Sequence, residues 1–216
     1  TIGDAINALK DGDIIYVNNG TYMENIDFNG KAITLRSVNG PENTIIDGNG
    51  NGVVVTMDSG EDENSILYGF TIRNGMDYKG GGVHIDGSSP IIRNCIIENN
   101  TAKNKGGGIF IYHSFALIDS CIIRNNGAER GGGIYTGATR DELGNPIFQN
   151  CEFTGNTSTS DGGGAYVYNM DATFKHCDFL NNQAEDDGGG LYLGKADSVY
   201  IAYGSFFSNN SVDMGG

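Results

Sequence analysis

The sequence has no tryptophan, only 3 prolines among its 216 residues, and no long apolar run. Because a membrane-spanning helix needs about 18 or more consecutive apolar residues, we expect no membrane-spanning segment. Basic residues are scarce as well: 13 lysines and arginines stand against 27 aspartates and glutamates, for a net charge of −14. That charge argues against nucleic acid and anionic membrane surfaces as partners, and favours cations or uncharged partners.

The chain also lacks an initiator methionine and a signal peptide, and it stops within a glycine run. We therefore expect a piece of a longer protein. Its 4 cysteines never form a CxxC pair, which excludes a zinc ribbon and a thioredoxin-like redox motif.

Glycine, in contrast, is abundant at 35 residues, and much of it lies in internal repeats. The fullest copy is NCIIENNTAKNKGGG at 94–108, and further copies lie at 120–133, 150–164 and 176–190, with a degenerate copy at 69–82 and a truncated one at 204–216. If Phe70, Cys95, Cys121, Cys151, Cys177 and Ser205 are equivalent, the steps are 25, 26, 30, 26 and 28 residues. A period of this length indicates stacked supersecondary units.

Each repeat alternates apolar and polar residues over short runs, as in Ile92, Cys95 and Ile97, which is typical of short strands with one apolar face. No helical pattern after Leu9 reaches 10 residues, so the class is all-β. The repeats keep their register residue by residue, which stacked parallel coils require and antiparallel hairpins do not. The sequence therefore predicts a parallel β-helix of about eight coils.

We expect a single β-helix domain over 1–216, made of a cap at 1–12, irregular first coils at 13–66, and coils of about 26 residues at 67–216. Strands in the first coils are expected at 14–17, 24–28, 32–38, 44–48 and 53–57. In the cap, Ala5, Ile6 and Leu9 share one helical face, and Thr1 and Asp4 have the spacing of an N-terminal capping box. A short helix there would cover the open end of the core.

Three ladders of equivalent residues are expected to hold the coils together. The asparagines five residues after each cysteine position are expected to hydrogen-bond up and down the helix: Asn100, Asn126, Asn156, Asn182 and Asn210. The glycine triplets at 80–82, 106–108, 131–133, 162–164 and 188–190 permit positive φ and close approach of neighbouring coils. Because strands stack about 4.8 Å apart and a disulfide needs Cβ atoms nearer 3.8 Å, a column of buried free thiols is predicted at Cys95, Cys121, Cys151 and Cys177.

The asparagine and glycine elements resemble the FxxN and GGA-aliphatic motifs of the chlamydial polymorphic membrane protein repeats. FxxN appears at 153–156, 179–182 and 207–210, and GGA at 163–165. The opening segment, residues 1–37, resembles the N-terminal coil of pectin-lyase-like β-helices. The resemblance implies a right-handed parallel β-helix displayed outside the cell or on its surface, as an adhesin or passenger, and it transfers no catalytic residue.

An outward row of rings is predicted two residues after each glycine triplet, at His84, Phe110, Tyr135, Tyr166 and Tyr192, and Tyr112 and Tyr168 would widen it. Rings at about 4.8 Å spacing suit stacking on sugar rings, so a polysaccharide or a host-cell glycan is the partner we expect there. The alternative is that the rings only stabilise the sheet among themselves.

Acidic turns precede the glycines, and stacked carboxylates there suit Ca²⁺. The candidates are Asp161, Glu185, Asp186 and Asp187, together with Glu129 and Asp213, and the segment 47–52 is a weaker candidate. The alternative is solvated loop charge. No other cofactor is expected.

Three functions remain open: a non-catalytic surface β-helix acting as an adhesin or carbohydrate-binding stalk, a carbohydrate-active enzyme of lyase or epimerase type, and a structural spacer. An insertion at 137–146, with Arg140, Asp141 and Glu142, would project from one face, where solenoids often bind. Catalytic pairing is not evident, since Asp186 and Asp187 would point to opposite faces of a strand, and His113 and His176 have no nucleophile beside them. Exposed terminal coils also allow end-to-end self-association.

Overall fold

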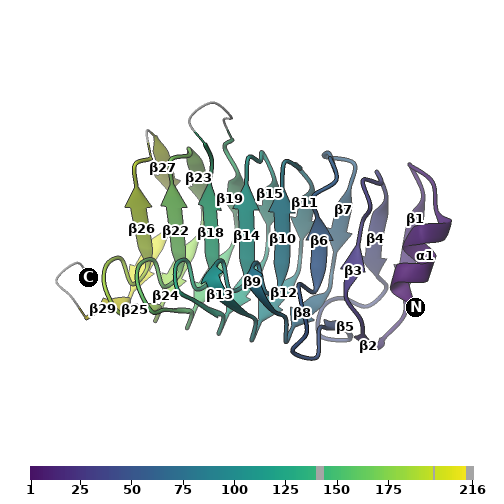
Figure 1. Ribbon diagram of the computed structural model, residues 1–216, viewed down its shortest axis with the longest axis horizontal. Coiled ribbons are helices and arrows are strands. Elements are labelled where there is room, and N and C mark those ends of the chain that lie inside the picture. The colour runs from purple at the N-terminus through teal and green to yellow at the C-terminus, as the bar shows by residue number, and fades with distance from the viewer. Residues whose placement is uncertain (140–143, 197, 213–216) are drawn as a thin grey trace.

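The computed structural model is a rod of stacked coils, with the helix α1 (Ile2–Ala8) at one end and β29 (Asn210–Ser211) at the other (Figure 1). It describes residues 1–139, 144–196 and 198–212. Every strand pair among these residues is parallel and joins one coil to the next, as Ile96 pairs with Ile122 one coil later. This pairing is that of a β-helix, so the predicted fold class is confirmed.

Four sheets run along the rod. The first contains β1 (Ile14–Val17), β4 (Thr34–Ser37), β7 (Ile66–Tyr68), β11 (Ile91–Arg93), β15 (Leu117–Asp119), β19 (Ile147–Gln149), β23 (Ala172–Lys175) and β27 (Val199–Ala202). The second contains β2 (Gly20–Met23), β5 (Thr44–Asp47), β8 (Thr71–Arg73), β12 (Ile96–Glu98), β16 (Ile122–Arg124), β20 (Glu152–Thr154), β24 (Asp178–Leu180) and β28 (Ser205–Phe207).

The other two sheets flank the glycine triplets. Before the triplets lie β9 (Met76–Lys79), β13 (Thr101–Lys105), β17 (Gly127–Ala128), β21 (Thr157–Ser158), β25 (Gln183–Ala184) and β29. After them lie β10 (Val83–Asp86), β14 (Ile109–Tyr112), β18 (Ile134–Gly137), β22 (Ala165–Tyr168) and β26 (Leu191–Gly194), and the same sheet continues through β3 (Ile26–Asp27) and β6 (Val55–Met57). We call this last sheet the ring sheet, because it carries the predicted aromatic row.

Among the described residues two sheets have eight strands and the ring sheet has seven, so the solenoid has about seven turns, slightly fewer than the eight coils expected. Two features were not expected. A coil has up to four strands among the described residues, because the short segments before the glycines pair into a sheet of their own. The strand β2 was missed, because its glycine follows Asn19 and reads as a turn.

The core is a set of columns in which equivalent side chains of successive coils stack inside the rod. One column is Leu67, Ile92, Ile118, Phe148 and Phe174, and each of these residues is fully buried. The four cysteines are free and buried in a column of the same core. Each large apolar side chain removed from water contributes roughly 1.5–3 kcal/mol, so the columns dominate the stability of the rod.

The helix α1 covers the N-terminal end of the core with Ile2 and Ile6, which are both buried. The Thr1 hydroxyl accepts the amide of Asp4 at 3.0 Å, as the capping spacing predicted. Glu24 accepts the amides of Ile2 and Gly3, and the Lys31 ammonium donates to three carbonyls at the other end of the helix, at 2.7–2.9 Å. A carboxylate at the N-terminus and an ammonium at the C-terminus complement the helix dipole, which helps so short a helix to form.

The asparagine ladder lies inside the turn. Each side-chain amide donates to the side-chain oxygen of the next coil, at 3.1 Å for Asn100 to Asn126 and for Asn126 to Asn156. Each also donates to a backbone carbonyl of the previous coil, so these fully buried amides are paired rather than left at the cost of buried unsatisfied groups.

At the C-terminal end of the ladder the predicted register was wrong by one residue. Asn182 donates to the Asn209 side chain at 2.9 Å, while Asn210 lies in β29 opposite Gln183. Ser205 pairs with Asp178, and Phe206 with Phe179, so the copy of FxxN spans 206–209 instead of 207–210. The last coil offers two adjacent phenylalanines and two adjacent asparagines, and alignment by sequence alone selected the wrong member of each pair.

Candidate functional site

The predicted aromatic row lies on the outer face of the ring sheet, one ring per coil. The centroids of successive rings are 5.0 Å apart from His84 to Phe110, 5.6 Å to Tyr135, 5.2 Å to Tyr166 and 4.8 Å to Tyr192. Residues on either side of the first rings lie in the core, as Ile109 and Ile111 do beside Phe110. Tyr112 and Tyr168 pack against the row as expected.

The row is covered, however, and is not an open platform. Phe110 is 1% exposed, Tyr135 2% and Tyr166 7%, whereas Tyr112, Tyr168 and Tyr192 are half-buried. The first glycine of each triplet explains part of this burial. At Gly106 the backbone has φ +65°, and a Cβ there would lie 2.9 Å from the Phe110 Cα, so only glycine lets the turn approach the row this closely.

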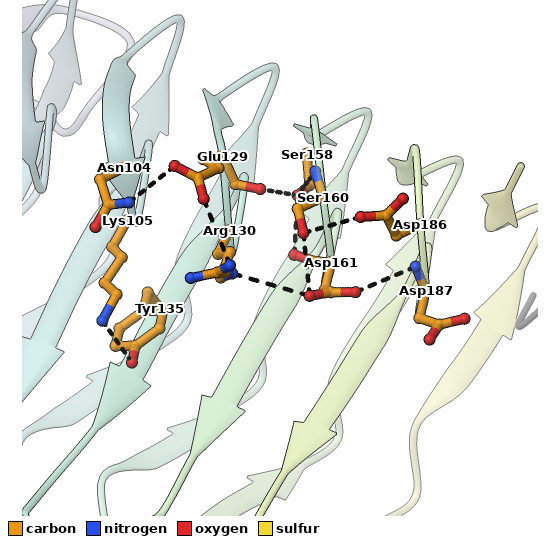
Figure 2. A network of polar contacts seen from close by, with 10 residues as sticks. All are labelled: Asn104, Lys105, Glu129, Arg130, Tyr135, Ser158, Ser160, Asp161, Asp186 and Asp187. Carbon is orange, nitrogen blue, oxygen red and sulfur yellow. Dashed lines mark hydrogen bonds and ion pairs between the residues drawn. The ribbon is translucent and has the colours of Figure 1, made fainter. Parts of the chain in front are cut away.

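Basic side chains from the same turns complete the cover. The Lys79 ammonium lies 5.0 Å from the Phe110 ring centroid, and that of Lys105 lies 4.5 Å from the Tyr135 centroid. Lys105 also donates to the Tyr135 hydroxyl at 3.1 Å (Figure 2). These cation–π contacts join Phe110 and Tyr135 to the turn of the preceding coil. The lysines and Arg130 were not singled out from the sequence, although each directly precedes a glycine triplet.

Burial shifts the ionisation of this cluster toward neutral forms. Burial raises the pKa of Tyr135 well above its ordinary value, and neighbouring tyrosines add to the shift. Burial likewise raises the pKa of Tyr166 to about 12. For Lys105, burial and repulsion by Lys79 and Arg130 lower the pKa. At neutral pH the tyrosines therefore carry hydroxyls that donate and accept hydrogen bonds.

Beside the row lies a hollow of about 350 Å³, lined by Lys105, Arg130, Tyr135, Tyr166 and Tyr168. We call it the tyrosine hollow. It combines two cationic groups with the edges and hydroxyls of three tyrosines. Such a lining suits a polar ligand that has some apolar surface, as a sugar has.

The acidic turns lie next to the tyrosine hollow. Asp161 accepts from the backbone amide of Asp187 at 3.3 Å and from the Ser160 hydroxyl at 3.2 Å, and its second contact across the coils is Arg130, at 3.9 Å (Figure 2). Asp186 accepts from the Ser160 hydroxyl at 3.1 Å, and Glu185 is exposed. Within the described ranges, no group of three or more His, Cys, Asp or Glu is placed to hold a metal ion. Calcium binding there stays a prediction, and Asp213 lies outside the described residues.

The remaining candidates have structural partners. His113 lies against the Tyr112 ring and its Nε2 is 3.1 Å from the Thr139 hydroxyl, while His176 stacks on Tyr203 with centroids 4.9 Å apart. In the segment 47–52, Asp47 is buried and binds Arg73 and Asn74. The insertion residues Arg140, Asp141 and Glu142 lie outside the described residues.

Comparison with known proteins gives the family. The sequence profile described as "Right handed beta helix region" matches residues 3–143. The chain belongs to this right-handed β-helix family. A second profile, the Chlamydia polymorphic membrane protein repeat, matches residues 150–168, which contain the FxxN motif at 153–156 and the GGA motif at 163–165. No curated protein matches the sequence.

Solved structures support the same fold. A carrot pectin methylesterase is 13% identical, with a TM-score of 0.56, over 98% of this chain and 80% of its own. A pectin methylesterase mutant in complex with a hexasaccharide is 11% identical, with a TM-score of 0.54, over 94% of this chain and 76% of its own. At these identities the likeness establishes the pectin-lyase-like β-helix fold alone. In the part of the chain that the structure describes, no helix is long and apolar enough to cross a membrane.

Proposed function

We propose that this β-helix is a non-catalytic polysaccharide-binding protein that acts outside the cell or on its surface, as an adhesin-like stalk. The observation that carries the proposal is the tyrosine hollow, where the half-buried Tyr168, two buried tyrosines and two cationic side chains adjoin a row of rings that spans five coils. The rod supplies a rigid support, since each ring is fixed by stacking on the next.

The binding surface in this proposal differs from the open row that the sequence suggested. Phe110 and Tyr135 are covered and serve as the floor, so contact with a sugar falls to the half-buried Tyr168 and Tyr192 and to the rim of Tyr166. The two solved structures support a sugar ligand only by analogy, because one of them holds a hexasaccharide. The match to the Chlamydia polymorphic membrane protein repeat supports a surface location in the same way.

A glycan array tests the proposal. We expect the protein to bind one or more polysaccharides, and we expect Tyr168→Ala with Tyr192→Ala to weaken binding about fivefold or more, since each ring contributes roughly 0.5–1.5 kcal/mol. Tyr16→Ala is the matched control, because Tyr16 is 64% exposed and lies in β1 of the first sheet. Binding that survives the double substitution, or an array without any bound glycan, contradicts the proposal.

End-to-end association remains a separate proposal. The last described coil leaves large apolar side chains exposed, among them Phe207 at 67% and Tyr203 at 83%. A second copy stacked on this coil would bury them, and sedimentation velocity over a concentration series would detect the longer species.

A further inference from the structure

The residue before each glycine triplet changes sign along the rod. The order is Lys79, Lys105, Arg130, Asp161 and Asp187. Lys79 pairs with Lys105, and Lys105 with Arg130, across neighbouring coils. The Gly131 amide donates to the Asp161 carbonyl, and that of Gly162 to the Asp187 carbonyl, which places the acidic residues on the same line. A molecule of net charge −14 thus gathers three cations on adjacent coils beside the tyrosine hollow.

These cations are only partly neutralised. Arg130 is 3.5 Å from the nearer Glu129 oxygen and 3.9 Å from Asp161, and both separations exceed those of a direct hydrogen bond (Figure 2). The Glu129 carboxylate also accepts from the Asn104 amide at 2.9 Å. Among the described residues, no carboxylate forms an ion pair with Lys79 or Lys105, and the one hydrogen bond that the Lys105 ammonium makes is to the Tyr135 hydroxyl.

Packing holds this arrangement together although the like charges repel. The lysine ammonium groups lie over rings of the next coil, and Lys105 and Arg130 line the same hollow. A half-buried ammonium with spare donors, near a guanidinium in a hollow lined by tyrosines, attracts an anion more strongly than a solvated surface lysine does.

We propose that the tyrosine hollow binds the anionic group of an acidic polysaccharide, with Lys105 and Arg130 contacting its carboxylate or sulfate oxygens and Tyr168 contacting the sugar ring. This inference rests on the proposed function and names the substrate class for the same site. Asp161 and Asp187 repel an anion at the neighbouring coils. The charge order therefore also sets which end of the row the acidic units occupy: the coils of Lys79, Lys105 and Arg130.

Three polymers with one backbone test the inference: dextran, carboxymethyl-dextran and dextran sulfate, measured by isothermal titration calorimetry in 50 mM and 300 mM NaCl. We expect both charged polymers, or one of them, to bind at least tenfold more tightly than dextran at 50 mM. The advantage should shrink severalfold at 300 mM, since salt screens a partly exposed site. Comparing carboxymethyl-dextran with dextran sulfate distinguishes a carboxylate ligand from a sulfate ligand.

Variants locate the effect in the hollow. Lys105→Met keeps the side-chain length and the packing on Tyr135, and we expect it to weaken binding of the charged polymer about tenfold while dextran binding stays unchanged. Lys175→Met is the matched control, because Lys175 is exposed in β23 of the first sheet. Asp187→Asn should strengthen binding severalfold, whereas Glu63→Gln, which removes a distant exposed charge, should not. A gain of affinity is not produced by misfolding.

The outcomes separate the two proposals. Equal binding of the three polymers, or equal losses in Lys105→Met and Lys175→Met, overturns the acidic ligand and leaves polysaccharide binding intact. If the charged polymers bind as expected but Tyr168→Ala has no effect, the anionic site stands and the ring contact is wrong. If none of the three polymers binds at millimolar repeat-unit concentration and the glycan array is also empty, both proposals fall.

Discussion

Two stacks of aromatic rings run along this β-helix, one inside the coils and one outside. The inner stack includes Phe153, Phe179 and Phe206, with centroids 4.6 and 4.7 Å apart and ring planes within 7° of parallel. The outer stack, from His84 to Tyr192, has wider steps of 4.8–5.6 Å and tilts of up to 30°. Both follow the coil spacing, but the inner rings Phe153 and Phe179 lie in the main core, whereas the outer rings form a separate cluster.

The difference shows what each environment admits. Inside, a ring with no polar atom meets only apolar neighbours, and phenylalanine is the residue found there. Outside, the rings form a separate small cluster, most carry a hydroxyl or an imidazole, and those of Tyr135 and His84 reach a polar neighbour. The outer rings are therefore adapted to an interface where one edge is wet, which is where a ligand is recognised.

The largest effect is expected for the inner stack. Phe153→Ala removes a fully buried ring that contacts Phe148, Phe174 and Phe179, and the coils on either side hold the cavity open. We expect the free energy of unfolding to fall by about 3–5 kcal/mol. Urea denaturation followed by circular dichroism measures it, and a loss below about 1 kcal/mol would show that the coil collapses onto the gap.

A smaller loss of the free energy of unfolding is expected for a substitution in the outer stack. Phe110→Ala removes a ring that is equally buried, but part of its cover is a flexible side chain, that of Lys79, which can move into the space. We expect a loss of about 2 kcal/mol in the same assay, made up of apolar burial and one cation–π contact. A loss as large as that of Phe153→Ala would mean that the outer cover is as rigid as the core, and the comparison between the stacks would fail.

The inner stack was predictable from the sequence, and the cover of the outer stack was not. Alternation within one repeat identifies residues such as Phe153 and Phe179 as inward, because a strand sends successive side chains to opposite faces. The same rule places Tyr135 outside, which is correct. Part of its burial, however, comes from Lys105, thirty residues earlier in the chain. Alternation along a strand predicts which face a side chain lies on, but it does not predict which side chain from the turn of the preceding coil covers it.

One signal for the cover was present in the glycine triplets. The second and third glycines let backbones of neighbouring coils meet, since a Cβ at Gly107 would lie 2.3 Å from the Gly127 carbonyl oxygen. The first lets the turn approach the ring. Reading the residue just before each triplet as part of the aromatic row would have identified Lys105 and Arg130. The one-residue error at Asn210 has a different cause, since both neighbouring asparagines satisfy the repeat and only the strand register separates them.

The smallest effect concerns pH, and it separates the stacks because only the outer one titrates. The pKa of Tyr166 is raised by burial to about 12 in the folded protein, against about 10 in an unfolded chain. Between these values the folded state keeps a proton that the unfolded state has lost, so the free energy of unfolding falls as pH rises above about 10 and levels off near 12. Below pH 10 this tyrosine causes no pH dependence.

Tyr166→Phe keeps the ring and removes the ionisation. Between pH 9 and pH 11.5 we expect the free energy of unfolding of the variant to fall by about 1 kcal/mol less than that of the wild type. Urea titrations at matched ionic strength measure this difference. Tyr16→Phe is the control, because Tyr16 is exposed, and it should follow the wild-type profile. Lys105 changes the free energy of unfolding with the opposite sign, because its pKa is lowered on folding. Lys105→Met should therefore make the free energy of unfolding fall more steeply as pH rises. If Tyr166→Phe and Tyr16→Phe give the same profile, the outer row is open to water and its cover is not as tight as the ring contacts indicate.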